Sequence, residues 1–98
     1  KESENNLNRL VKHNILILFS NFYKIKNDWE RTIEYAQNAQ EIRLNFSEEY
    51  SNLAIGYFKK GDYLKAKEIA SKGLEFCSSS EACDFLKFVI SKTEEANN

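Results

Sequence analysis

Residues 50–76, YSNLAIGYFKKGDYLKAKEIASKGLEF, decide the fold. Their pattern also occurs 34 residues upstream, where aromatic, turn and small residues stand in register: Tyr23, Asn27-Asp28-Trp29, Ala36 and Ala39 correspond to Tyr57, Gly61-Asp62-Tyr63, Ala70 and Gly73. A period of this size is typical of supersecondary units that bury their apolar faces only by stacking on one another. Each unit reads as a helix, a tight turn and a second helix. The sequence therefore predicts a short all-α helical solenoid.

The second unit resembles the tetratricopeptide repeat (TPR) family, at the consensus positions held here by Leu53, Ala54, Tyr57, Gly61, Tyr63, Ala66 and Leu74. The first unit resembles it through Leu16, Phe19, Tyr23, Trp29, Ala36 and Ala39, although Ser20, Asn27 and Thr32 replace residues that are usually Gly or Ala. The resemblance implies a right-handed superhelix that binds other proteins. It divides one domain, residues 1–98, into an N-terminal helix extension (1–12), repeat 1 (13–46), repeat 2 (47–80) and a C-terminal solvating helix (81–96), with five helices in all.

Local signals predict where these helices begin and end. The first helix, about residues 5–26, has an apolar stripe of Leu7, Leu10, Val11, Ile15, Leu18, Phe22 and Ile25. Asp28 and Asp62 are predicted to cap the second and fourth helices, and Gly61 to end the third. We expect the second helix to fade by Leu44. Serines are expected to cap the third helix (Ser47) and the fifth (Ser78 or Ser80), and the apolar face of the fifth helix contains Phe85, Phe88 and Val89.

Composition argues against several functional classes. The 14 basic and 15 acidic residues give a net charge of −1, which provides no electrostatic footprint for nucleic acid or an anionic membrane. No apolar run approaches the roughly 20 residues that a membrane-spanning helix needs. Because the chain has no phosphate-binding glycine loop and no nucleophile elbow, we expect no catalysis, cofactor or metal site. His13 is expected on the surface and Glu48-Glu49 on a solvated helix face. The many Lys, Asn, Ile, Phe and Tyr residues suggest an AT-rich genome.

The two cysteines, Cys77 and Cys83, are too few for a disulfide scaffold and lack the companions of a zinc site. We therefore expect reduced thiols and a cytoplasmic protein. The chain begins with Lys1 and shows no signal peptide, so we interpret it as an excised domain.

The concave face of the predicted solenoid is the candidate functional surface. In the resembling family it is built from the first helix of each repeat and holds an extended peptide or a partner helix. Helical geometry places ten residues on this face: Asn14, Ile17, Asn21, Lys24 and Ile25 from the first repeat, and Ser51, Asn52, Ile55, Phe58 and Lys59 from the second. Seven of them are the predicted binding residues: Ile17, Asn21, Lys24, Asn52, Ile55, Phe58 and Lys59. Asn21 and Asn52 offer amide donors and an acceptor to a peptide main chain or a terminal carboxylate, and Lys24 suits the carboxylate charge.

Three alternatives remain open. The two asparagines resemble those of TPR co-chaperones that clamp the acidic C-terminal tail of heat-shock chaperones, but Ile17 replaces the clamp's first lysine, and only Lys87 or Lys92 could supply a later charge. Secondly, the run Ile15–Phe19 cannot wholly face one partner helix. The rest of its surface then packs against a preceding segment, lines a functional apolar groove or forms the contact of a homodimer. Thirdly, the domain is a regulatory part of a larger protein, including an enzyme whose catalytic domain lies elsewhere.

Overall fold

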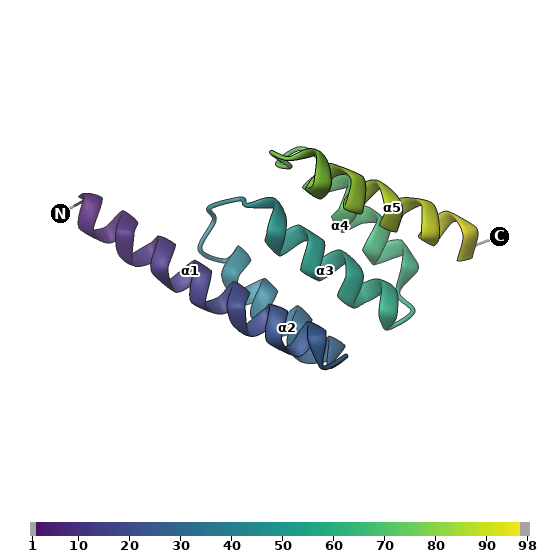
Figure 1. The fold of residues 1–98 in the computed structure, drawn as a ribbon, viewed down its shortest axis with the longest axis horizontal. Helices are drawn as coiled ribbons and strands as arrows, with labels where there is room; N and C mark the ends of the chain where they lie inside the picture. The colour runs from purple at the N-terminus through teal and green to yellow at the C-terminus, as the bar shows by residue number, and fades with distance from the viewer. Residues whose placement is uncertain (1, 97–98) are drawn as a thin grey trace.

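The computed structural model describes residues 2–96, and the side chains of residues 5–96. Within this range the fold consists of five α-helices, which confirms the all-α prediction: α1 (Glu2–Ile25), α2 (Trp29–Gln40), α3 (Ser47–Lys59), α4 (Tyr63–Gly73) and α5 (Ser80–Ala96). The pairs α1–α2 and α3–α4 pack as helical hairpins, α2 joins the two pairs by packing on α3, and α5 covers α3 and α4 (Figure 1). None of the five helices in this range is long and apolar enough to cross a membrane.

The two hairpin turns share one conformation. Asn27 and Gly61, which are 34 residues apart, both have positive φ, at 61° and 89°. The aspartate that follows each of them caps the next helix, because Asp28 Oδ1 accepts a hydrogen bond from Arg31 N and Asp62 Oδ1 accepts one from Lys65 N, both at 3.2 Å. An asparagine tolerates the left-handed conformation better than most residues, so it can replace glycine in the first turn. Both predicted aspartate caps are confirmed.

Only some of the other helix boundaries agree with the prediction. Helix α2 ends at Gln40, which agrees with the expectation that it fades by Leu44, and Arg43 and Asn45 in the following loop adopt positive φ, which no helix can continue through. At the start of α3 the capping position belongs to Phe46, so Ser47 is already helical and makes no cap. Neither Ser78 nor Ser80 caps α5: Ser79 Oγ accepts the hydrogen bond from Ala82 N at 3.1 Å.

The core lies where α3 and α4 meet their neighbours. One buried cluster joins α3, α4 and α5, and a second joins α2 and α3; their members are Ala54, Ala66, Ala70, Leu86 and Val89, and Ile33, Ala36 and Leu53. Small residues allow the helices to approach closely, since a Cβ built at Gly73 would lie 2.7 Å from Tyr50 Cβ. Of the predicted apolar face of α5, Val89 is buried, but Phe88 is 53% exposed, and the buried face also contains Leu86 and Thr93.

Helix α1 packs through a different face from the one predicted. Its buried side chains are His13, Ile17 and Ser20, and Ser20 Oγ donates a hydrogen bond to Thr32 O at 2.7 Å. The seven residues of the predicted apolar stripe are exposed instead, from 38% at Leu10 to 80% at Ile25. The apolar periodicity of this helix therefore does not mark the face that packs within the domain. The polar face is buried because partners elsewhere in the fold satisfy its hydrogen bonds.

His13 and Glu49 form a buried pair, so the expectation that both side chains face solvent is wrong. Their exposed fractions are 1% and 0%, and His13 Nε2 lies 3.0 Å from Glu49 Oε2, within hydrogen-bond distance. The edge of the His13 ring also meets the ring of Phe46, with the centroids 5.0 Å apart. Burial raises the pKa of the Glu49 carboxyl, and the hydrogen bond with His13 opposes that shift. The pair ties α1 to the first turn of α3.

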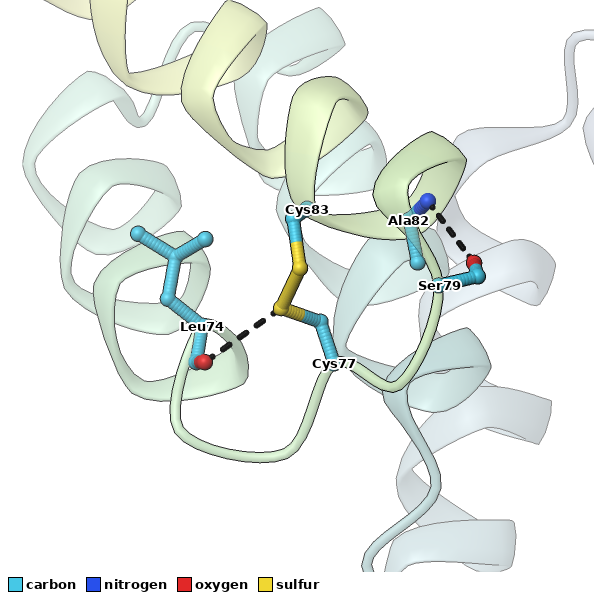
Figure 2. Close-up of a disulfide and its surroundings, with 5 residues drawn as sticks. All are labelled: Leu74, Cys77, Ser79, Ala82 and Cys83. Carbon is cyan, nitrogen blue, oxygen red and sulfur yellow. Dashed lines mark hydrogen bonds between the residues drawn. A yellow bond between two sulfur atoms is a disulfide. The ribbon is translucent and has the colours of Figure 1, made fainter.

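The expectation of reduced thiols is also wrong. Cys77 and Cys83 form a disulfide that closes the loop between α4 and α5, with their Cα atoms 5.5 Å apart (Figure 2). Cys77 Sγ lies 3.4 Å from Leu74 O, at the end of α4. Disulfides persist mainly in oxidising compartments. The inference of a cytoplasmic location, which depended on free thiols, therefore loses its basis.

Reducing this disulfide should destabilise the domain. The cross-link spans only six positions, so the loop-entropy argument gives a loss of about 2 kcal/mol in the free energy of unfolding. Urea denaturation with and without dithiothreitol measures the loss. A Cys77→Ser/Cys83→Ser variant should match the reduced protein and should not respond to the reductant. If reductant leaves the wild-type denaturation midpoint unchanged, the bond contributes nothing to stability.

Candidate functional site: the groove across α1, α3 and α5

A hollow of about 320 Å³ lies where side chains of three helices converge. Helices α1, α3 and α5 form one layer of the fold, with α2 and α4 behind them, so residues far apart in the sequence share this surface (Figure 1). Most of the lining residues have polar or charged side chains, although more of the lining surface is apolar than polar. The residues are Lys24 from α1; Ser47, Glu48, Ser51 and Asn52 from α3; Ser79 from the loop before α5; and Glu81, Ala82 and Phe85 from α5. We call this surface the groove. Its volume is at the lower end of the range for ligand pockets.

Asn52 organises one wall of the groove. Its Nδ2 donates hydrogen bonds to Ser20 Oγ at 3.0 Å and to Asn21 Oδ1 at 2.8 Å. Its Oδ1 accepts a hydrogen bond from Lys24 Nζ at 2.9 Å. Because the side chain is 1% exposed and both amide hydrogens are used, Asn52 positions its neighbours and has no free donor for a ligand.

The network continues to the rim. Asn21 Nδ2 donates a hydrogen bond to Glu48 Oε2 at 3.2 Å, so Glu48 is held beside the same wall. Burial lowers the pKa of the Lys24 ammonium, and the nearby Glu48 carboxylate opposes that shift. The groove thus presents one ammonium and two carboxylates, those of Glu48 and Glu81. Its electrostatic balance favours a neutral or basic ligand over an acidic one.

The structure brings together three of the seven predicted residues. Asn21, Lys24 and Asn52 belong to one hydrogen-bonded network, and Lys24 and Asn52 line the groove. The other four lie elsewhere. Ile17 is 3% exposed and belongs to the core, which corrects its assignment to the groove. Ile55 is half-buried on α3.

The last two predicted residues pack against aromatic rings. The ring of Phe58 lies 5.2 Å from that of Tyr63, at the start of α4. The ammonium of Lys59 lies 5.9 Å from the centre of the Trp29 ring, at the start of α2. Both residues therefore face the hairpin turns and do not contribute to the groove lining.

Sequence reasoning missed the contribution of α5. The sequence pattern places Phe85 on the packing face of the fifth helix and gives no reason to assign Glu81 to a binding surface. The two are four residues apart, so they share one face of α5, and that face meets the groove. The same spacing links Glu48 with Asn52 on α3, a signal that could have placed Glu48 beside the predicted asparagine.

No family model matches this chain, and no curated protein matches it either.

Proposed function

We propose that this chain is a non-enzymatic protein-interaction module: a right-handed TPR superhelix of two repeats and a solvating helix, whose groove binds an extended peptide. The superhelix is supported by the repeated turn, in which residues 34 positions apart share both the positive φ and the aspartate cap. Peptide binding is supported by one observation above all, the hollow shared by α1, α3 and α5, which combines polar side chains with apolar surface. A groove that is already formed binds a peptide without ordering itself first.

The lining suggests the chemistry of the peptide. The hydroxyls of Ser47, Ser51 and Ser79 can donate to and accept from a peptide main chain. The carboxylates of Glu48 and Glu81 suit a basic side chain, and Phe85 offers an apolar contact. We therefore propose an uncharged or basic peptide segment as the ligand. Asn21 and Lys24 contribute from the α1 wall, and Asn52 holds that wall in place.

The acidic tail of a heat-shock chaperone is the less favoured alternative. Its carboxylates would meet Glu48 and Glu81, and Ile17 is in the core, where it cannot take the place of a clamp lysine. Among the described residues, Lys24 is the lysine that lines the groove, and its ammonium already donates a hydrogen bond to Asn52 Oδ1. A regulatory role within a larger protein is compatible with the same groove, since it would need only a peptide from that protein.

Selection from a phage-displayed library of random decapeptides tests the proposal. We expect the enriched peptides to carry Lys or Arg and to bind with micromolar affinity in calorimetry. Glu48→Lys should weaken the binding of such a peptide about tenfold, because it places like charges together. Glu34→Lys, an equal charge change on the exposed surface of α2, is the matched control and should leave the affinity unchanged.

Two results would contradict this proposal. In the first, Glu48→Lys and Glu34→Lys change the affinity for the selected peptides by the same factor, which would place the binding site elsewhere. The other comes from titrating an acidic chaperone C-terminal peptide beside its amidated form. Binding that is lost on amidation would establish carboxylate recognition and make the co-chaperone function the leading one.

A further inference from the structure

The exposed face of α1 carries a heptad pattern that the groove does not use. Val11, Ile15, Leu18, Phe22 and Ile25 follow one another at alternating spacings of four and three residues, and we call them the α1 seam. Their side chains are 48%, 47%, 67%, 50% and 80% exposed. The alternation matches the a and d positions of a coiled coil, with Ile15 and Phe22 at a and the other three at d. This is the narrow stripe that a helix uses to pack along another helix.

The exposed apolar area is large enough for an interface. Leu7, Leu10 and Phe19 are also exposed on α1, at 58%, 38% and 47%, which brings the number of exposed large apolar side chains on the described part of this helix to eight. With roughly 150 to 200 Å² for a fully accessible side chain of this size, the eight expose on the order of 700 Å². The largest patch on a typical monomer is about 300 to 600 Å². One partner in a standard interface buries about 800 Å².

The seam also has the shape that receives side chains from a second helix. Ile15, Leu18, Phe19, Phe22 and Tyr23 surround a hollow of about 330 Å³ on this face. Helix α2 supports its floor, since Tyr35 stacks on both Phe19 and Tyr23 with ring centroids 5.2 and 5.5 Å apart. Apolar side chains that surround a hollow form the hole into which a knob from a facing helix inserts.

The charges beside the seam are basic. Residues 5–26 contain four basic side chains and no acidic one. Lys12 and Lys26 occupy e positions of the heptad, and Lys26 Nζ lies 5.0 Å from the centre of the Phe22 ring. Glu41, the residue that follows α2, lies near Lys12 and Arg9, where it offsets one of these charges, and the rim stays positive. Charges at e positions select partners with the opposite charge on the facing helix.

We propose that the α1 seam docks an amphipathic helix of a partner protein, with apolar residues at its a and d positions and acidic residues on the flank that faces Lys12 and Lys26. A second copy of this chain fits less well. In an antiparallel pair Lys12 would face Lys26, and in a parallel pair these lysines would face Leu7 and Asn21, so neither arrangement provides an opposite charge. An anionic membrane surface is also less suited, because the seam is narrow and its other flank carries the neutral residues Asn14 and Asn21.

Two synthetic helical peptides of three heptads test the proposal. Both carry Leu at a and d; one has Glu at every e and g position and the other has Lys, so neither pairs with itself. We expect the 98-residue chain to bind the Glu peptide with micromolar affinity and the Lys peptide at least about tenfold more weakly. Lys12→Glu/Lys26→Glu should reverse this preference, and added salt should reduce it.

A variant of the seam itself separates docking from folding. Leu18→Glu changes a side chain that is 67% exposed, so helicity and the denaturation midpoint should stay at their wild-type values while binding of the Glu peptide falls at least about tenfold. Leu64→Glu, at a position on α4 that is 75% exposed, is the matched control and should leave binding intact. Leu18→Glu should also leave peptide binding in the groove unchanged, so the two proposals fail or succeed independently.

Three results would overturn the partner-helix proposal. The first is equal affinity for both peptides that Lys12→Glu/Lys26→Glu does not change, because it would show that the seam does not select acidic residues on its partner. The second result is failure to bind either peptide, together with a molar mass in sedimentation equilibrium that rises with concentration in the wild type but stays at the monomer value in Leu18→Glu. It would make the seam a homodimer contact. Binding to phosphatidylserine-containing vesicles that Leu18→Glu abolishes, again with no binding to either peptide, would make it a membrane-binding surface.

Discussion

Replacing His13 by alanine should lower the free energy of unfolding by about 3 kcal/mol. The substitution leaves the Glu49 carboxyl fully buried without its histidine partner, and its second oxygen, Oε1, already lacks a hydrogen-bond partner among the described residues. Breaking a buried pair by removing one partner typically costs about 3 to 5 kcal/mol. We expect the lower end, because protonation of Glu49 can relieve part of the penalty. Urea denaturation at neutral pH measures the effect.

The pH dependence of that loss identifies its cause. The native pKa of Glu49 is already raised, and removal of His13 takes away a contact that lowers it. The native state of the variant therefore binds a proton at a higher pH than the unfolded chain, whose glutamate titrates near 4.5. The penalty should be complete above the raised native pKa and should shrink as the pH falls toward 4.5. A loss that does not change with pH would indicate a cavity effect and no buried charge.

Replacing both members of the pair provides the control. In His13→Leu/Glu49→Met, two apolar side chains fill the space and no unpaired polar group remains. Exchange of a buried pair for packed apolar groups is often neutral or stabilising. We therefore expect the double variant to be more stable than His13→Ala. If His13→Ala unfolds at the same urea concentration as the wild type, the pair does not anchor α1 to α3.

Replacing Leu86 by alanine should destabilise the domain by about 3 kcal/mol, and the matched change Phe88→Ala should cost less than about 0.5 kcal/mol. Leu86 is fully buried between α5 and the α3–α4 hairpin, so its truncation loses apolar burial and leaves a cavity. Phe88, two positions later on α5, is 53% exposed and its ring lies 5.5 Å from Lys92 Nζ. Exposed substitutions usually stay within about 0.5 kcal/mol.

Chemical denaturation of the two α5 variants measures which face of this helix packs on the domain. The reverse order of effects would mean that α5 uses the Phe88 face, as the sequence pattern suggested. Equal, small effects would mean that α5 hardly contributes to the cooperative unit. The expected order makes α5 part of the core, which is also required if Glu81 and Phe85 are to complete the groove.

Part of the candidate site was predictable from helical geometry. Asn21 and Lys24 lie one turn apart on the first helix, and helical geometry also places Asn52 on the concave face of the third helix, so all three were expected on one surface. The role of each of these residues in binding did not follow from helical geometry. Asn52 on α3 is not free to bind a ligand, because the α1 side chains Ser20, Asn21 and Lys24 hydrogen-bond to it. These bonds use both of its amide hydrogens and one lone pair of its oxygen.

The sequence by itself determined the five helices, the repeat and the two aspartate-capped turns, because each depends on a few adjacent residues and their backbone preferences. Only the tertiary structure decided which faces meet. Apolar periodicity placed Leu18 on the apolar stripe and left His13 on the surface, yet Leu18 is exposed and His13 is buried, where Glu49, 36 residues away, lies within hydrogen-bond distance of its ring nitrogen. Pairing of Cys77 with Cys83 likewise required the loop geometry. Hydrogen bonds and contacts between distant residues outweigh a local apolar pattern, and that pattern contains no information about them.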